Sequence, residues 1–231
     1  MPQQCVDDER NVSVTLARTA AAMLGRAELH FFSRAKQTMG MPATERSWTR
    51  EEVLDLIARN PLDVPRYELV DGVLLVTPGP TNVHQRAVGR IFALLSAYLD
   101  IERAVGEAFT SPADVMPEEG TTVGPDVFVV PPDEAARVFE GGPFRKLALA
   151  IEVLSPRDRS GDRGRKRKLY HRTVPEYWIV DSDTRTIEVW KSGVLNGTMQ
   201  ADAIDWNPLG ATQPFVLDVR AYFARVFRED L

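Results

Sequence analysis

The sequence is poor in cysteine and histidine and contains no long apolar run. Cys5 is the one cysteine among 231 residues, so no disulfide can form within the chain, and we expect a reducing, cytoplasmic environment. No stretch of about 18 consecutive apolar residues occurs, so we expect no membrane span. The apolar stretch at 14–24 contains Arg18 and follows three acidic residues, so we interpret it as a short helix and not as a signal peptide.

Two further absences argue against whole classes of enzyme. No G-x-x-x-x-G-K-S/T loop is present, so nucleotide-driven chemistry is not expected. There is no G-x-S-x-G motif, and the three histidines are His30, His84 and His171, which argues against a Ser-His-Asp hydrolase. The net charge of -5 argues against a general nucleic-acid coat. It is compatible with an enzyme acting on DNA, because such an enzyme needs only a local basic surface and its acidic metal ligands lower the total.

The composition changes near residue 41. Residues 1–40 are rich in alanine and lack strand patterns, so we predict an N-terminal extension that adds little to the core. Residues 41–231 then form a single domain, a normal size for one. Its first helix is expected to follow Thr49 as the capping residue and to end before Pro61.

The rest of the domain alternates strands and helices. Asp71-Gly72 between two apolar runs predicts a β-hairpin, and Thr81 or Asn82 is expected to cap the next helix. That helix has a predicted core face of Val88, Ile91, Leu94, Leu95 and Leu99. Further strands are expected at 105–110, within 124–132, within 147–155, at 176–181 and at 185–193. A helix is expected at 162–172, a loop with a weak strand at 196–214, and a final amphipathic helix at 218–230 whose core side carries Val219, Tyr222, Phe223 and Val226. The order predicts an α/β (α+β) fold with one central mixed β-sheet flanked by helices.

Two carboxylates occupy unusual positions. Asp126 opens an apolar strand directly after Pro125, and Glu152 interrupts the apolar run LALAIEVL. Carboxylates are rarely buried unless they are paired or bind a metal. If the two strands are neighbours, Asp126 and Glu152 converge and could hold Mg²⁺ or Mn²⁺. Equally, Glu152 could be paired with a basic residue or face solvent, and Asp126 could be a turn or cap residue.

A strongly basic segment follows Glu152. Between 157 and 172 it carries Arg157, Arg159, Arg163, Arg165, Lys166, Arg167, Lys168 and Arg172. A helix that packs back onto the sheet can direct one of these lysines at the carboxylates, and the others could hold phosphates. An ordinary solvated helix face explains the same composition.

Several short motifs together resemble a known family. They are YELVDG at 67–72, His84-Gln85, Pro125-Asp126, IEVLS at 151–155, the D-x-G-x-K-x-x-x-Y pattern of Asp162, Gly164, Lys166 and Tyr170, and VPEYWIVD at 174–181. In order and spacing, from about Trp48 to Trp190, they resemble the PD-(D/E)XK nuclease superfamily and, more narrowly, the bacterial Uma-two family of restriction endonuclease-like proteins. The resemblance implies a restriction endonuclease-like fold.

The resemblance also implies a metal-dependent endodeoxyribonuclease. Asp126 and Glu152, helped by the carbonyl of Val153, would hold Mg²⁺ or Mn²⁺. Lys166 would be the catalytic lysine, with Lys168 as the alternative. The superfamily places its lysine two residues after the acid, where this chain has Leu154. In this chain the lysine is therefore expected to come from the following helix.

Several other residues are secondary candidates for the site. Glu68 would complete the acidic site or lie at the edge of its hairpin, and His84 would touch substrate or act locally at its helix start. Gln85, Arg163 and Lys168 are the remaining candidates for substrate binding. We expect Tyr170 and Trp178 to be core aromatic residues, and Asp114 to lie near the site.

Two other functions remain open. The first is a non-catalytic nucleic-acid-binding or regulatory module on the same fold, suggested by Leu154 and the acidic total charge. The second is hydrolysis of another phosphate ester. DNA is the expected partner, and by analogy with related nucleases, which cut duplex DNA as dimers, we expect a homodimer.

Overall fold

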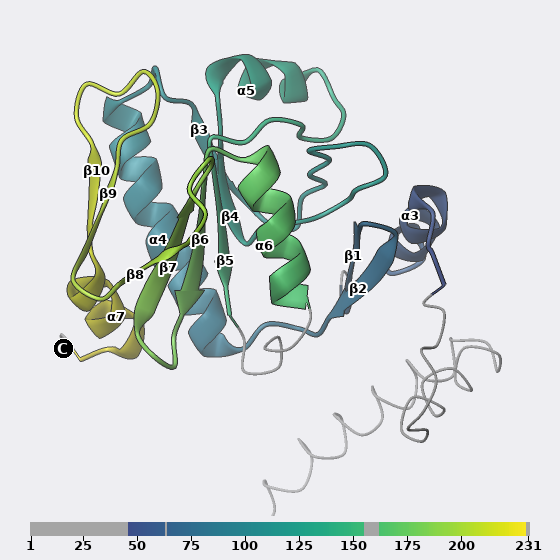
Figure 1. Cartoon of the computed structure of the whole chain (residues 1–231), viewed down its shortest axis with the longest axis horizontal. Helices are drawn as coiled ribbons and strands as arrows, with labels where there is room; N and C mark the ends of the chain where they lie inside the picture. The colour runs from purple at the N-terminus through teal and green to yellow at the C-terminus, as the bar shows by residue number, and fades with distance from the viewer. Residues whose placement is uncertain (1–45, 63, 155–161, 230–231) are drawn as a thin grey trace, which may run out of the picture. The chain divides into compact units, whose positions relative to one another are not determined.

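A six-stranded mixed β-sheet forms the centre of the computed structural model (Figure 1). The structure describes residues 46–62, 64–154 and 162–229, which belong to one unit. In sheet order the strands are β3 (Glu107–Thr110), β4 (Val127–Val130), β5 (Leu149–Val153), β6 (Glu176–Asp181), β7 (Thr186–Lys191) and β8 (Thr198–Gln200). The predicted central mixed sheet is therefore confirmed, whereas the predicted extension at 1–40 lies outside the described residues.

The connection between β5 and β6 gives the sheet its mixed character. These two strands pair in parallel, whereas the other neighbouring pairs of the six-stranded sheet are antiparallel. A parallel pair requires a crossover, and here helix α6 (Asp162–Thr173) returns the chain across one face of the sheet. The part of the basic segment that forms α6 is thereby packed against the sheet, and its helical conformation agrees with the prediction.

The two faces of the sheet are covered by different elements (Figure 1). Side chains of a strand alternate between faces, so Val127 and Val129 belong to one core and Phe128 and Val130 to the other. The first core contains α4 (Asn82–Ile101), α7 (Val219–Phe227) and the hairpin of β9 (Ala203–Trp206) and β10 (Phe215–Asp218). The second contains α6, α5 (Pro132–Phe139) and the hairpin of β1 (Arg66–Val70) and β2 (Val73–Thr77). Both faces are buried, which explains why β4 is continuously apolar and β5 is apolar apart from Glu152.

The local signals in the sequence were accurate. Helix α3 (Arg50–Ala58) begins after Thr49, which forms a capping box with Glu52. The β1–β2 turn has Asp71 and Gly72 at φ angles of 51° and 74°, as a two-residue hairpin turn requires. Thr81 caps α4, and the four predicted core residues of α7 are all buried.

Three elements differ from the sequence prediction. Residues 196–214 contain two strands, β8 and β9, instead of a loop with one weak strand, and β10 follows directly. These strands are only three or four residues long, so the pattern of one segment carries little information until its partner is known. Helix α5 was not predicted, because it has only eight residues, begins at Pro132 directly after Pro131, and buries Glu134 as well as Ala135. In α4, Val88 and Leu94 are half-buried at the margin of the predicted core face.

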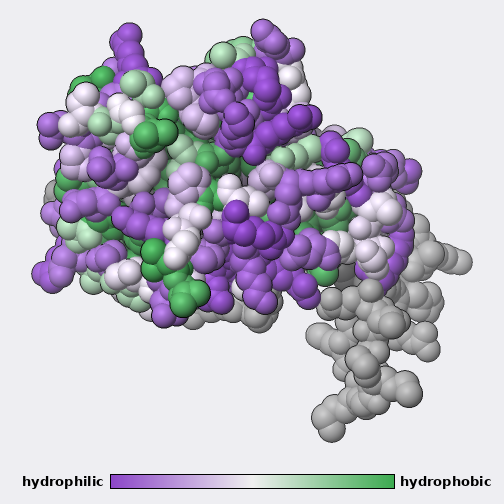
Figure 2. Space-filling view, turned by 45° about the horizontal axis from the view of Figure 1, so that its top comes forward, coloured by the Kyte–Doolittle hydropathy of each residue, from purple (hydrophilic) through white to green (hydrophobic). Residues whose placement is uncertain are grey.

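The surface is mainly polar. Figure 2 shows hydrophilic residues over most of the face that it draws, with hydrophobic residues in separate, smaller areas. Among the described residues, no helix combines the length and the apolar character needed to cross a bilayer.

Two glycines offer a matched test of the fold. Gly106 has a φ angle of +136°, and an added Cβ would lie 1.8 Å from the carbonyl oxygen of Val130. Gly89 is exposed in the middle of α4, where an added Cβ meets no described atom within 4 Å. We expect Gly106→Ala to lower the free energy of unfolding by at least about 2 kcal/mol, and Gly89→Ala to raise it by about 0.5–1 kcal/mol. Urea denaturation measures both, and equal effects of the two changes would contradict the close approach of β3 and β4.

Candidate active site

Asp126 and Glu152 lie close together because their strands are neighbours in the sheet. In the antiparallel pairing of β4 and β5, Val127 lies opposite Ile151. Extending this register by one residue places Asp126 next to Glu152, and both side chains are buried. The expected convergence of the two carboxylates is therefore observed.

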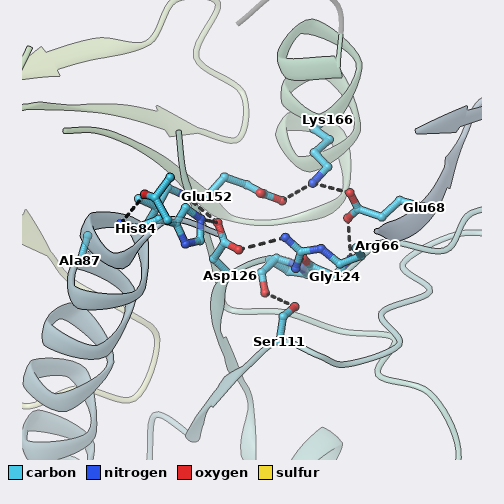
Figure 3. Close-up of polar contacts among 12 residues, drawn as sticks. Arg66, Glu68, His84, Ala87, Ser111, Gly124, Asp126, Glu152 and Lys166 are labelled. Carbon is cyan, nitrogen blue, oxygen red and sulfur yellow. Dashed lines mark hydrogen bonds and ion pairs between the residues drawn. The ribbon is translucent and has the colours of Figure 1, made fainter. Parts of the chain in front are cut away.

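Asp126 is held by three donors (Figure 3). Arg66 Nη2 lies 3.1 Å from Oδ1, while His84 Nε2 at 3.1 Å and the backbone amide of Val153 at 2.9 Å contact Oδ2. Burial alone would raise the pKa of Asp126, but the His84 contact and the Arg66 charge outweigh it and hold this pKa well below its usual range. Asp126 is therefore ionised at neutral pH.

Lys166 joins the other two carboxylates. It enters from α6, and its Nζ lies 2.7 Å from Glu68 Oε2 and 3.0 Å from Glu152 Oε1 (Figure 3). The second oxygen of Glu68 accepts a hydrogen bond of 2.8 Å from the amide of Gly124. Burial opposes the charged lysine, but the two glutamates outweigh it and raise the pKa of Lys166, so the side chain is an ammonium ion.

Glu152 is the least stabilised of the three carboxylates. Its Oε1 also accepts a hydrogen bond of 3.1 Å from the hydroxyl of Tyr170. Burial raises the pKa of Glu152 to about 7, since the lysine charge offsets only part of the cost and Asp126 and Glu68 add repulsion. When Glu152 is ionised and His84 is neutral, the described side chains of the cluster have three carboxylates against two permanent cations, Arg66 and Lys166.

The cluster lies at a pocket of about 470 Å³. The wall includes Gln85 and Arg163, two of the predicted substrate-binding residues, and Arg163 is paired with Glu188 at 2.5 Å. Lys168 is exposed and is not among the residues of this wall. Asp114, which was expected near the site, lines a second pocket of about 80 Å³ whose wall also includes Arg66 and Glu68.

Arg66 is the residue of the cluster that sequence reasoning missed. It stands two positions before Glu68 in β1, so their side chains share one face of the strand, a relation that the alternation of a strand could have revealed. Tyr170 was expected as a core aromatic residue and is fully buried, but its hydroxyl also contacts Glu152. Trp178 lies in the core, as expected.

The donors at this site fit a hard divalent cation. No group of three or more His, Cys, Asp or Glu side chains in the described part of the chain is arranged to enclose a metal. However, Mg²⁺ commonly binds proteins through one or two carboxylates and completes its coordination with water and substrate phosphate. Asp126 and Glu152 supply two such carboxylates at the pocket.

Comparison with known proteins agrees with the observed fold. A crystal structure described as that of "a putative nuclease belonging to DUF820" from Anabaena variabilis is 20% identical, with a TM-score of 0.60 over 75% of this chain and 98% of that one. At this identity the likeness shows the fold alone. No curated protein matches the chain. The model of the Uma2 family, described as "Putative restriction endonuclease", matches residues 50–219. Since that match spans most of the sequence, the chain belongs to the Uma2 family.

Proposed function

We propose that the protein is a divalent-metal-dependent endonuclease that hydrolyses phosphodiester bonds in DNA. One observation carries the proposal: a buried ammonium ion, Lys166, lies between Glu68 and Glu152 beside the ionised Asp126, at the floor of a pocket. Perturbed carboxylates and a buried lysine in a cleft are typical of catalytic sites. Membership of the Uma2 family supports a nuclease in particular.

Asp126 and Glu152, with the carbonyl of Val153, are the proposed ligands of Mg²⁺ or Mn²⁺. When bound, such an ion would activate a water molecule and stabilise charge on the attacked phosphate. Arg66 and His84 would orient the Asp126 carboxylate, because each contacts a different oxygen of it. Tyr170 would orient Glu152 in the same way.

Lys166 is the proposed catalytic lysine. Its ammonium group would orient the attacking water or stabilise negative charge that develops on the phosphate. Glu68 would keep it protonated and directed at the site. Gln85 and Arg163 would contact the substrate at the pocket, whereas Lys168, exposed on α6, would contribute to a basic surface that attracts phosphates.

This arrangement favours an enzyme over a non-catalytic binding module. The alternative drew on Leu154, which stands where the superfamily has its lysine. The contact of Lys166 Nζ with Glu152 supports a catalytic lysine from α6 instead, which answers that argument but not the one from the acidic total charge.

The two lysines of α6 provide a matched pair of variants. We expect Lys166→Met, Asp126→Asn and Glu152→Gln each to lower the rate of plasmid nicking in Mg²⁺ by at least about 100-fold, because each loses charge stabilisation of the transition state or metal binding. Lys168→Met removes the same charge from an exposed position and should change the rate less than about 3-fold at physiological salt. Nicking by the purified proteins, with and without EDTA, measures these rates. Wild-type nicking that resists EDTA, or equal loss in both lysine variants, would contradict the assignment.

The pH dependence of stability tests the state of Glu152. A carboxyl whose folded pKa is raised stabilises the fold below its unfolded value, near 4.5, and this contribution is lost as the pH rises through about 7. In EDTA, the wild type should therefore lose up to about 3 kcal/mol of stability between pH 4.5 and 8 relative to Glu152→Gln. Parallel pH profiles of the two proteins would refute the raised pKa.

Binding of Mg²⁺ should restore the stability that the wild type loses as the pH rises. At pH 8, millimolar Mg²⁺ is expected to raise the melting temperature of the wild type, because the ion binds the folded state only. Glu152→Gln should respond less, since it lacks one proposed ligand. The experiment compares thermal unfolding of both proteins across a Mg²⁺ titration, and equal responses would place the metal elsewhere.

We also propose a homodimer, on the analogy with nucleases that cut both strands of a duplex. Size-exclusion chromatography with light scattering is expected to give twice the chain mass. A monomer at micromolar concentration, with or without DNA, would refute this part of the proposal.

A further inference from the structure

The pocket has two chemically different sides. Its floor carries the charged cluster, whereas part of its wall is apolar and belongs to α4. We call Val88, Gly89 and Phe92 of α4, together with Pro80 and Pro112, the apolar wall. Val88, Gly89 and Phe92 lie within one helical turn of each other on the side of α4 that also carries His84, so the apolar wall continues directly from the cluster.

The apolar wall faces open space. Phe92 and Val88 are half-buried, and Gly89 and Pro80 are exposed. A Cβ added to Gly89 would meet no described atom within 4 Å, so the glycine leaves the helix surface open at this point. The pocket volume of about 470 Å³ lies within the range that encloses a small organic ligand, which is roughly 300–1,000 Å³.

The described cations of the pocket are already paired with carboxylates. Arg66 contacts Asp126, Lys166 contacts Glu68 and Glu152, and Arg163 contacts Glu188. The outer surface of an intact duplex presents a row of phosphates, which an apolar wall beside paired cations would bind poorly. An unpaired nucleotide presents one phosphate and one exposed base, and a base stacks on aromatic and apolar side chains regardless of its sequence.

We propose that the pocket binds an unpaired nucleotide, with its phosphate at the Asp126–Glu152–Lys166 floor and its base against the apolar wall. The inference rests on the proposed function, since it takes the ligand to be a nucleic acid, and it adds the class of substrate. The protein then prefers single strands, bulges or flipped bases to intact duplex. Phe92 is the specificity-determining residue of this preference.

Binding in the absence of cleavage tests the proposal. Three fluorescein-labelled DNAs of one sequence serve as probes: a single strand, an intact duplex, and a duplex with a three-nucleotide bulge. Fluorescence anisotropy of the full chain gives their dissociation constants, with Ca²⁺ in place of Mg²⁺ to supply the cation and under conditions in which the probes stay intact. We expect the single strand and the bulge to bind at least about 5-fold more tightly than the duplex.

Substitutions in α4 test which residues cause the preference for unpaired DNA. Phe92→Ala should weaken single-strand binding roughly 5- to 100-fold and duplex binding little, because it removes one stacking surface. Phe92→Tyr keeps the aromatic face and should retain the preference. Leu94→Ala is the matched control, because Leu94 is half-buried on the same helix but outside the pocket wall. Gly89→Leu places a side chain in the open space in front of the apolar wall. Because Gly89 is exposed, this variant should fold, and it should weaken single-strand binding even if Phe92→Ala does not fold.

Each outcome separates this inference from the proposed function. Equal or tighter binding of intact duplex, or no effect of either Phe92→Ala or Gly89→Leu, overturns the inference, and Mg²⁺-dependent nicking would then still support a nuclease. A preference for unpaired DNA that depends on these residues, without cleavage of any probe in Mg²⁺, supports the inference and overturns the nuclease. Absence of DNA binding together with absence of cleavage overturns both.

Discussion

The buried contact of Lys166 with Glu68 and Glu152 is the interaction on which the arrangement of the site depends. Its three members come from α6, β1 and β5, so the helix, the hairpin and the central sheet must all be in place before it forms. Each charge is costly to bury by itself, and removal of one partner would leave the others uncompensated. The contact therefore fixes the positions of the β1–β2 hairpin and of α6 relative to the end of β4 where Asp126 lies.

The same cluster is imperfectly balanced, and this imbalance has a chemical meaning. Asp126 has three donors and remains ionised, whereas Glu152 is held by Lys166 and Tyr170 and has a pKa raised to about 7. A fold selected only for stability would gain from an apolar residue at this position of β5. Under the proposed function, this carboxylate is kept because it would hold a cation, at a cost in stability.

Much of this could be predicted from the sequence, because the relevant signals were local. The Asp71-Gly72 turn, the Thr49 and Thr81 caps and the apolar runs of β4 and β5 depend on neighbouring residues only, and each was correct. Asp126 and Glu152 were found because a carboxylate is conspicuous in an apolar strand. The family pattern then indicated Lys166, which lies on α6 and contacts Glu152 of β5.

The residues that were missed depend on contacts distant in the sequence. Arg66 begins an ordinary hairpin strand, and although strand alternation relates it to Glu68, its contact with Asp126, 60 positions later, depends on the approach of β1. Tyr170 is a core aromatic residue, as expected, but the contact of its hydroxyl with Glu152 depends on the packing of α6 against the sheet. The β9–β10 pair is similar: each strand has four residues and becomes recognisable only through its partner.

A crystal structure with Mn²⁺ would test the central claim most directly. The anomalous signal of manganese identifies the ion without reference to catalysis. The account predicts a peak bonded to carboxylate oxygens of both Asp126 and Glu152, with the Lys166 ammonium group beside it. Manganese bound only at other surface carboxylates, with Lys166 still bridging Glu68 and Glu152 at saturating metal, would contradict it.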